Sequence, residues 1–225
     1  MKLEFNVERM LVALRLMKLV VPRRHPKRVL TYAKLTATPD RVVMSATNLD
    51  VSVRCDVAGV IVDIPGEVLL DVGPLEQLLT SVPDAALQLS DSVSGCRVSS
   101  PLMEVEIETE DIVNFPEVAE FDGQNCYAMQ PDALRSLFRR TAFATDDESM
   151  RYALGGIKAE WENGNLIFVG TDGRRLAKAE AAASAVGSPE LLVDLVITNA
   201  ATPVIEAVLD TNAEVQFARV GDLCV

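Results

Sequence analysis

Residues 166–177 read Leu-Ile-Phe-Val-Gly-Thr-Asp-Gly-Arg-Arg-Leu-Ala, an apolar run that enters a polar turn and leaves it through two arginines. The apolar run predicts a β-strand, and a second strand leaves the turn. Asp172 can bond the backbone two residues on, and Gly173 adopts a positive φ at no steric cost. The stretch therefore predicts a tight turn at a sheet edge. The side chains presented there are those of Thr171, Arg174, Arg175 and Leu176.

The composition is that of a globular protein with an ample core. The chain has 225 residues, of which 49% are hydrophobic, so one large or two ordinary domains are expected. The formal net charge of −12 argues against a generally basic nucleic-acid binder. The net charge still allows a nucleic-acid binder whose positive charge is confined to a single surface, because binding depends on the local electrostatic potential.

Four cysteines, Cys55, Cys96, Cys126 and Cys224, lie far apart and form no CxxC motif. This spacing predicts neither a zinc site nor a dense disulfide framework, so reduced thiols and no bound cofactor are expected. The N-terminus does not have the shape of a signal peptide, and no apolar run approaches membrane-spanning length. These features predict a soluble cytoplasmic protein without membrane association.

The first half of the chain reads as strand, helix and three strands, and then repeats that order. The predicted helices start at Glu8, ending before Pro22, and at Pro74. The predicted strands cover about 3–7, 30–37, 41–46, 50–57, 68–70, 86–90, 95–99 and 102–108.

The pattern then restarts with a strand at Cys126–Met129, a helix from Pro131, and strands near 152–161 and 165–170. Asn163-Gly164 joins the last two as a hairpin signal. Thr47-Asn48 recurs as Thr171-Asp172 at an offset of 124, and Phe5–Val7 recurs as Tyr127–Met129 at an offset of 122. We interpret this as an internal duplication. The sequence thus predicts an α+β protein with two domains, 1–122 and 123–225, the second incomplete at its C-terminal end.

Five motifs give this chain a resemblance to a known family. They are Met1–Phe5 (MKLEF), Ala46–Asp50 (ATNLD), Asp111–Pro116 (DIVNFP), Arg151–Gly156 (RYALGG) and Thr171–Ala177 (TDGRRLA). Together they resemble the bacterial DNA polymerase III β subunit, the sliding clamp of DNA replication. The resemblance implies a processivity factor that tethers the polymerase and is not itself an enzyme. It also implies three clamp domains per chain and a homodimeric ring around duplex DNA, with helices lining the hole.

Some positions depart from the family pattern. Arg174 stands where the family commonly has His, Gly155 where it has Asn, and 197–200 lacks the usual basic residues. A third domain is absent from these 225 residues. The chain is therefore interpreted either as a fragment or truncated form, or as a divergent relative that cannot close the usual ring.

The resemblance implies a site for short linear peptides of the polymerase and the clamp loader. An apolar floor with a rigid polar rim suits such peptides. The alternative is an ordinary β-turn with solvated arginines. The matching residues are Leu154, Thr171, Gly173, Arg174, Arg175 and Leu176.

For double-stranded DNA, the resemblance implies contacts from Arg24 and Tyr152. Further basic side chains of the inner helices are candidates, with solvated helix faces as the alternative interpretation. Nothing in the sequence predicts base readout, so binding is expected to be sequence-independent and directed at the backbone. These helix candidates are Arg9, Arg15, Lys18, Arg135, Arg139 and Arg140.

Two other functions remain open from the residues. One is a clamp-like paralogue that binds partner peptides without encircling DNA. The other is a metal-dependent enzyme that uses Asp146 and Asp147, beside Glu148, to hold Mg²⁺. Adjacent loop carboxylates are more often solvated, and the chain has no phosphate-binding loop or nucleophile elbow.

Overall fold

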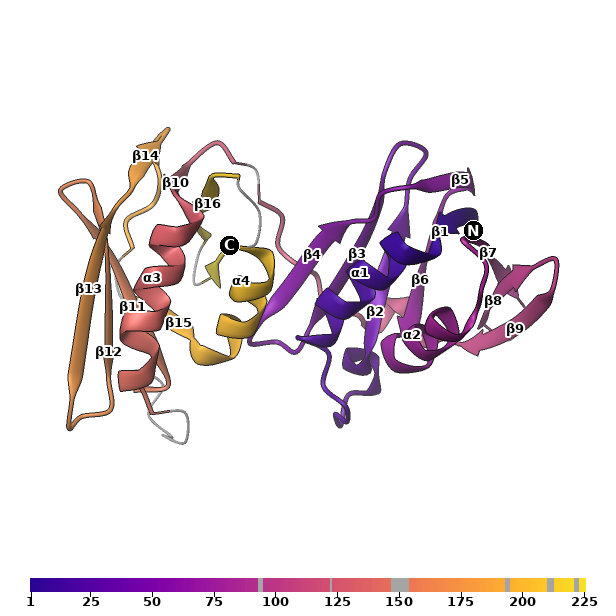
Figure 1. Cartoon of the computed structure of the whole chain (residues 1–225), viewed down its shortest axis with the longest axis horizontal. Coiled ribbons are helices and arrows are strands. Elements are labelled where there is room, and N and C mark those ends of the chain that lie inside the picture. The colour runs from indigo at the N-terminus through magenta and orange to yellow at the C-terminus, as the bar shows by residue number, and fades with distance from the viewer. Residues whose placement is uncertain (93–94, 122, 147–153, 193–194, 210–212, 221–222) are drawn as a thin grey trace. The chain divides into compact units, whose positions relative to one another are not determined.

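The computed structural model describes the chain except for residues 93–94, 122, 147–153, 193–194, 210–212 and 221–222. The chain divides into two compact units, Met1–Val118 and Ala119–Val225. The boundary placed at 122 and 123 from the sequence lies just beyond this division. Each unit is described by itself (Figure 1).

Unit 1 consists of two helices, which pack on each other, and two antiparallel sheets, which they contact. Its sheets have the strand orders β5-β1-β7-β8-β9 and β4-β3-β2-β6. The two strand–helix–three-strand halves of unit 1 start with β1 and with β6. The first strand of each half pairs with the three-strand part of the other half, because β1 pairs with β7 and β6 pairs with β2. The elements are β1 (Lys2–Asn6), α1 (Val7–Lys18), η1 (Arg28–Thr31), β2 (Tyr32–Ala37), β3 (Val42–Thr47), β4 (Ser52–Asp56), β5 (Val60–Ile64), β6 (Gly66–Asp71), α2 (Val72–Ser81), β7 (Ala86–Ser92), β8 (Gly95–Ser100), β9 (Met103–Glu108) and η2 (Ile112–Asn114).

Unit 2 repeats this architecture. Its main sheets have the orders β14-β10-β16 and β13-β12-β11-β15, which match β5-β1-β7 and β4-β3-β2-β6 element for element. Phe5 and Tyr127 therefore occupy equivalent strands, as the duplication predicted. The elements are β10 (Cys126–Met129), α3 (Pro131–Thr141), η3 (Ala142–Ala144), β11 (Gly156–Glu162), β12 (Asn165–Thr171), β13 (Leu176–Ala182), β14 (Ser184–Val186), β15 (Leu195–Thr198), η5 (Asn199–Ala201), α4 (Thr202–Val208), β16 (Val215–Phe217), β17 (Arg219–Val220) and β18 (Leu223–Cys224).

The predicted α+β fold of doubled strand–helix–three-strand units is thus confirmed. The structure adds β5 and β14, two edge strands that the sequence pattern did not predict. The four cysteines, all of which the structure describes, form no disulfide with one another. Within the described parts of the chain, no helix is long and apolar enough to cross a membrane.

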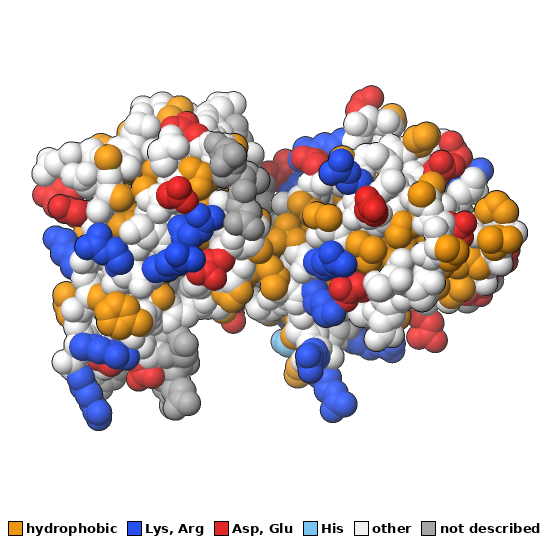
Figure 2. Space-filling model, in the orientation of Figure 1, with side chains coloured by type: hydrophobic (Ala, Val, Ile, Leu, Met, Phe, Trp, Pro, Cys, Tyr) orange, Lys and Arg blue, Asp and Glu red, His pale blue; other side chains and the backbone are white. Residues whose placement is uncertain are grey.

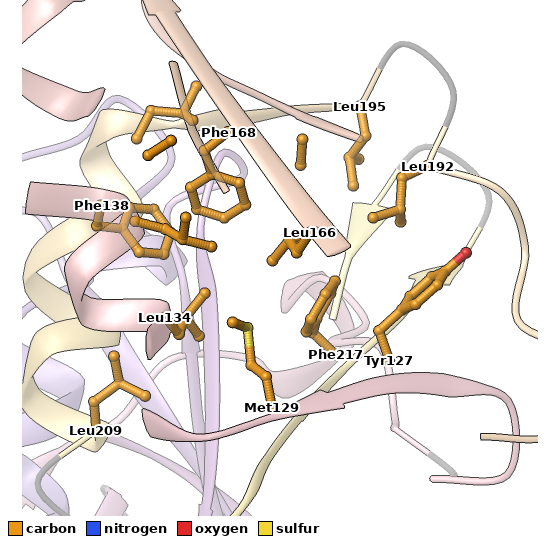
Figure 3. Close-up of a cluster of buried hydrophobic side chains, with 14 residues drawn as sticks. Tyr127, Met129, Leu134, Phe138, Leu166, Phe168, Leu192, Leu195, Leu209 and Phe217 are labelled. Carbon is orange, nitrogen blue, oxygen red and sulfur yellow. The ribbon is translucent and has the colours of Figure 1, made fainter. Parts of the chain in front are cut away.

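The core of unit 2 forms where α3 packs on the sheet that contains β11, β12 and β13 (Figure 3). Phe138 of α3 meets Phe168 of β12 edge to face, with ring centroids 5.0 Å apart. Tyr127 stacks on Phe217 with centroids 5.4 Å apart, and its hydroxyl donates to the Glu190 carbonyl over 3.1 Å. Such aromatic pairs add to the stabilisation from burial, so the first fixes α3 against the sheet and the second supports the pairing of β10 with β16.

The last turn of α3 lies directly against the backbone of β12. A Cβ atom at Gly170 would come within 2.4 Å of the Thr141 carbonyl oxygen, so only glycine fits there without a shift. The Thr141 hydroxyl is buried and donates to the Leu137 carbonyl over 2.7 Å. This approach sets the position of the chain that follows α3, next to the end of β12.

Replacing Gly170 by Ala is expected to destabilise unit 2 by about 1–3 kcal/mol, because the new methyl group overlaps a backbone oxygen. Trp161 is the only tryptophan and packs against the unit 2 core, so its fluorescence during urea unfolding reports this change. The control is Gly73→Ala in unit 1, where the nearest atom lies at 3.8 Å. An unchanged Trp161 transition in Gly170→Ala would contradict the packing argument.

Candidate functional site

The candidate peptide site lies where four strand ends of one sheet meet. Thr171 at the end of β12 pairs with Leu176 at the start of β13. Gly156 at the start of β11 pairs with Thr198 at the end of β15. Leu154 precedes β11 and is therefore at this same end of the sheet. The turn between β12 and β13 closes the end.

The turn is held by its own side chains. The Asp172 carboxylate oxygen Oδ1 accepts hydrogen bonds from the backbone N–H groups of Arg174 and Arg175, both over 2.9 Å. The Thr171 hydroxyl accepts from the Gly173 N–H over 3.1 Å and donates to the Arg175 carbonyl over 2.7 Å. Gly173 has a φ of +84°, as the sequence predicted. The turn is thus rigid although it is exposed.

Unit 1 builds the equivalent turn from different residues. Asn48 Oδ1 accepts from the N–H groups of Asp50 and Val51 over 3.0 and 2.7 Å, and the Thr47 hydroxyl accepts from the Leu49 N–H over 3.0 Å. Leu49 takes the glycine position with a φ of +80°. An asparagine oxygen therefore replaces the Asp172 carboxylate as acceptor, which confirms the repeat at atomic detail.

The structure brings five of the six predicted peptide-site residues into this turn. Leu176 is 67% exposed, and Gly173, Arg174 and Arg175 are exposed as well. Thr171 is half-buried. An apolar side chain thus faces solvent next to two cationic ones, and the peptide-binding role of this surface stays a prediction.

Leu154, the sixth residue, is half-buried at the start of β11. Its carbonyl accepts a hydrogen bond from the Asp146 N–H over 2.8 Å, and the Gly155 carbonyl accepts from the Asn199 N–H over 3.4 Å. Asn199 Nδ2 also donates to the Thr145 hydroxyl. The segments after α3, before β11 and after β15 are therefore tied together beside the turn.

Phe143 belongs to this surface and was not predicted. It lies in η3, is 60% exposed, and its ring faces the Arg175 guanidinium, whose carbon lies 5.7 Å from the ring centroid. Arg175 Nε also donates to Asp172 Oδ2 over 2.9 Å. A sequence signal was available, because Phe143 falls outside the apolar stripe that α3 buries: Leu134, Leu137, Phe138 and Thr141.

The electrostatics of the turn follow from these bonds. The backbone N–H groups of Arg175 and Arg174 stabilise the ionised carboxylate and lower the pKa of Asp172, and the Arg175 guanidinium adds to this effect. Because the pKa is lower in the folded state, the stabilisation is present above the unfolded pKa. It is lost as the pH falls through the folded value.

The candidate DNA-contacting residues of α3 divide into two kinds. Arg139 and Arg140 are exposed and make no ion pair with the described residues. Arg135 instead bonds Asp132 over 2.6 Å and donates to the Leu209 carbonyl over 2.8 Å. Arg135 thus ties α3 to the end of α4.

In unit 1, Arg9 and Arg15 of α1 are exposed, and Arg24 is exposed in the loop that follows. Lys18 forms an ion pair with Glu76 of α2 over 2.5 Å. Figure 2 shows Lys and Arg side chains over α1 of unit 1 and, for unit 2 taken by itself, over α3. Tyr152 lies outside the described residues.

The acidic cluster lies mostly outside the described residues, since only Asp146 of the three is described. Across the parts of the chain that the structure describes, no group of three His, Cys, Asp or Glu side chains is placed to hold a metal ion.

Fold and turn together define a protein built from duplicated DNA-clamp domains. Residues 128–218 match the family model "DNA polymerase III beta subunit, central domain". The "Beta sliding clamp" of Chlamydia muridarum is 30% identical over 72% of this chain and 44% of its own length. That of Caulobacter vibrioides is 31% identical over 86% of this chain and 54% of its own length.

Among solved structures, a Pseudomonas aeruginosa sliding clamp bound to griselimycin superposes with a TM-score of 0.85 and 25% identity. The match covers 98% of this chain and 60% of that one. The resemblance to the bacterial DNA polymerase III β subunit is thereby confirmed. The chain spans about half the length of the curated relatives it matches.

Asp172→Asn is expected to preserve the turn, because Asn48 holds the equivalent turn in unit 1, whereas Asp172→Ala removes the acceptor of two N–H groups. Amide hydrogen exchange at Arg174 and Arg175 should therefore accelerate in the Ala variant and change little in the Asn variant. NMR titration of the wild-type carboxyl should give a midpoint below that of an unstructured aspartate. Equal exchange in all three proteins would contradict this account.

Proposed function

We propose that this chain acts as a DNA sliding clamp, a processivity factor that tethers the replicative polymerase to duplex DNA. Its role is that of an accessory subunit and not of an enzyme. The observation that carries the proposal is the exposed turn Thr171–Leu176 at the end of a sheet, which is held by hydrogen bonds between its own residues. The turn belongs to a fold that this chain shares with β clamps. Curated relatives named "Beta sliding clamp" support the same function.

The proposed partners of the turn are short linear peptides of the polymerase and clamp-loader subunits. Ordering such a peptide costs entropy, which an apolar contact must offset. Leu176 supplies that contact at 67% exposure, and the rigid turn loses little freedom on binding. Small interfaces concentrate their free energy in a few desolvated contacts, so Leu176 should dominate.

Leu176→Ala is expected to weaken binding of a labelled polymerase-tail peptide by about 1–3 kcal/mol, because a large exposed aliphatic group is buried in the complex. Arg174→Ala, at an exposed rim, should cost at most about 1 kcal/mol. Fluorescence anisotropy measures both, with Leu191→Ala as a matched control because Leu191 is 65% exposed elsewhere in unit 2. Equal weakening by Leu176→Ala and Leu191→Ala would place the site elsewhere.

Each unit offers its own candidate DNA surface: the exposed basic residues of α1 with the loop residue Arg24 in unit 1, and those of α3 in unit 2. These side chains are compatible with phosphate contacts, and nothing in the arrangement predicts contacts with base edges. Their number is small beside the net charge of −12, so attraction to DNA is expected to come from these local surfaces and not from the charge of the whole chain.

The 225-residue chain is accordingly expected to bind linear duplex DNA weakly, with an affinity that falls steeply with salt. The double variant Arg139→Ala/Arg140→Ala should reduce the slope of log K against log salt by about 0.9 for each phosphate that is no longer neutralised. Arg41→Ala is the control, because Arg41 is already bonded to Asp56 over 2.5 Å. Tight retention on linear DNA at physiological salt would argue against this interpretation.

The alternative function, a clamp-like protein that binds partner peptides without encircling DNA, shares the peptide site and lacks the ring. Retention on a nicked circular plasmid, compared with the same plasmid after linearisation, separates the two. Release on linearisation supports a closed ring around the DNA. Equal retention on both forms supports the alternative.

A further inference from the structure

Phe143 is the exposed residue of a segment whose other members, residues 141–145, are buried or half-buried. Its neighbour Ala144 is fully buried, whereas the Phe143 side chain is 60% exposed. The backbone below it is held from two sides: Thr141 contacts Gly170 of β12, and the Thr145 N–H and hydroxyl both bond the Ala142 carbonyl, over 3.2 and 2.7 Å. The ring is therefore presented to solvent by a rigid support.

Arg175 is held on this ring by three further restraints. Its N–H bonds Asp172 Oδ1, its Nε bonds Asp172 Oδ2, each over 2.9 Å, and its carbonyl accepts from the Thr171 hydroxyl. The guanidinium carbon lies 5.7 Å from the Phe143 ring centroid, within the range of a cation–π contact. The side chain is 58% exposed, and its two terminal nitrogens bond none of the described residues.

A guanidinium fixed in this way is ready to receive a carboxylate. Its two terminal nitrogens form a planar fork that matches the two oxygens of an Asp or Glu side chain. A free arginine at the surface loses rotamer freedom when it forms such a pair, and this loss cancels much of the attraction. The Phe143 ring and Asp172 remove that freedom beforehand.

We propose that Phe143 is a positioning residue of the peptide site, which holds Arg175 to select a partner peptide with an acidic residue beside its apolar anchor. The inference rests on the proposed function of the Thr171–Leu176 turn and adds to it the charge preference of the ligand. Phe143 acts through Arg175, so its removal should affect acidic peptides selectively.

The test uses a fluorescent polymerase-tail peptide in two forms, one with its acidic residues and one with each replaced by Asn or Gln. Wild type should prefer the acidic form by about five-fold at low salt. Phe143→Leu, which keeps an apolar side chain, should weaken the acidic form by about two- to five-fold and leave the amide form unchanged. Phe143→Trp should preserve the preference, since indole is the best cation–π partner.

Two controls separate this inference from the proposed function. Phe121→Leu changes another exposed phenylalanine of unit 2 and should alter neither affinity. Leu176→Ala should weaken both peptide forms alike. If wild type binds neither form, or Leu176→Ala changes nothing, the peptide site itself is wrong and the role of Phe143 fails with it. If Leu176→Ala weakens both forms but Phe143→Leu does so equally, the site stands and the role proposed for Phe143 is overturned.

Discussion

The contact between the Thr141 carbonyl and Gly170 is the constraint on which the surface of unit 2 depends. It brings the end of α3 onto β12 one residue before the turn, at a distance that only glycine allows. Phe143 is thereby placed beside Arg175, and Thr145 is placed to bond Asn199. The sheet, the helix and the turn come from separate stretches of the sequence but form one rigid surface. The packing between them is so close that even one extra methyl group would not fit without a shift.

The duplication indicates which features of the turn are structural. Unit 1 and unit 2 share the Thr hydroxyl and the Asx oxygen that accept three backbone N–H groups, so these residues serve the fold in both. They differ in the residues that face solvent. Unit 1 places Leu49 at a positive φ, whereas unit 2 uses Gly173 there and follows it with two arginines. The proposed binding role therefore resides in side chains that the fold does not require.

The order of the elements was predictable from the sequence because local signals mark it. Asn163 and Gly164 both have positive φ values, as the hairpin signal required. β14 was missed because all three of its residues are exposed and carry no alternation, and β5 buries too few side chains to be recognised. The role of Arg135 was also not predictable, since the carbonyl that it bonds lies 74 residues away. To predict Phe143 as a site residue, one would have to know that it lies next to Arg175, and only the tertiary packing brings the two together.

The distribution of ion pairs explains how an acidic chain presents basic surfaces. Several basic residues in or next to the strands of unit 1 are neutralised by neighbouring carboxylates: Arg28 with Glu108 and Glu110, Lys34 with Glu67, Arg41 with Asp56, and Arg97 with Glu104 and Glu106. On α1 and α3, Arg15, Arg139 and Arg140 form no ion pair with the described residues. The field near a helix face falls off over about 8 Å in physiological salt, so a ligand there responds to those arginines more than to the net charge. A negative net charge therefore does not by itself exclude binding to an anionic partner. The ion pairs within the protein determine which charges remain for the partner to contact.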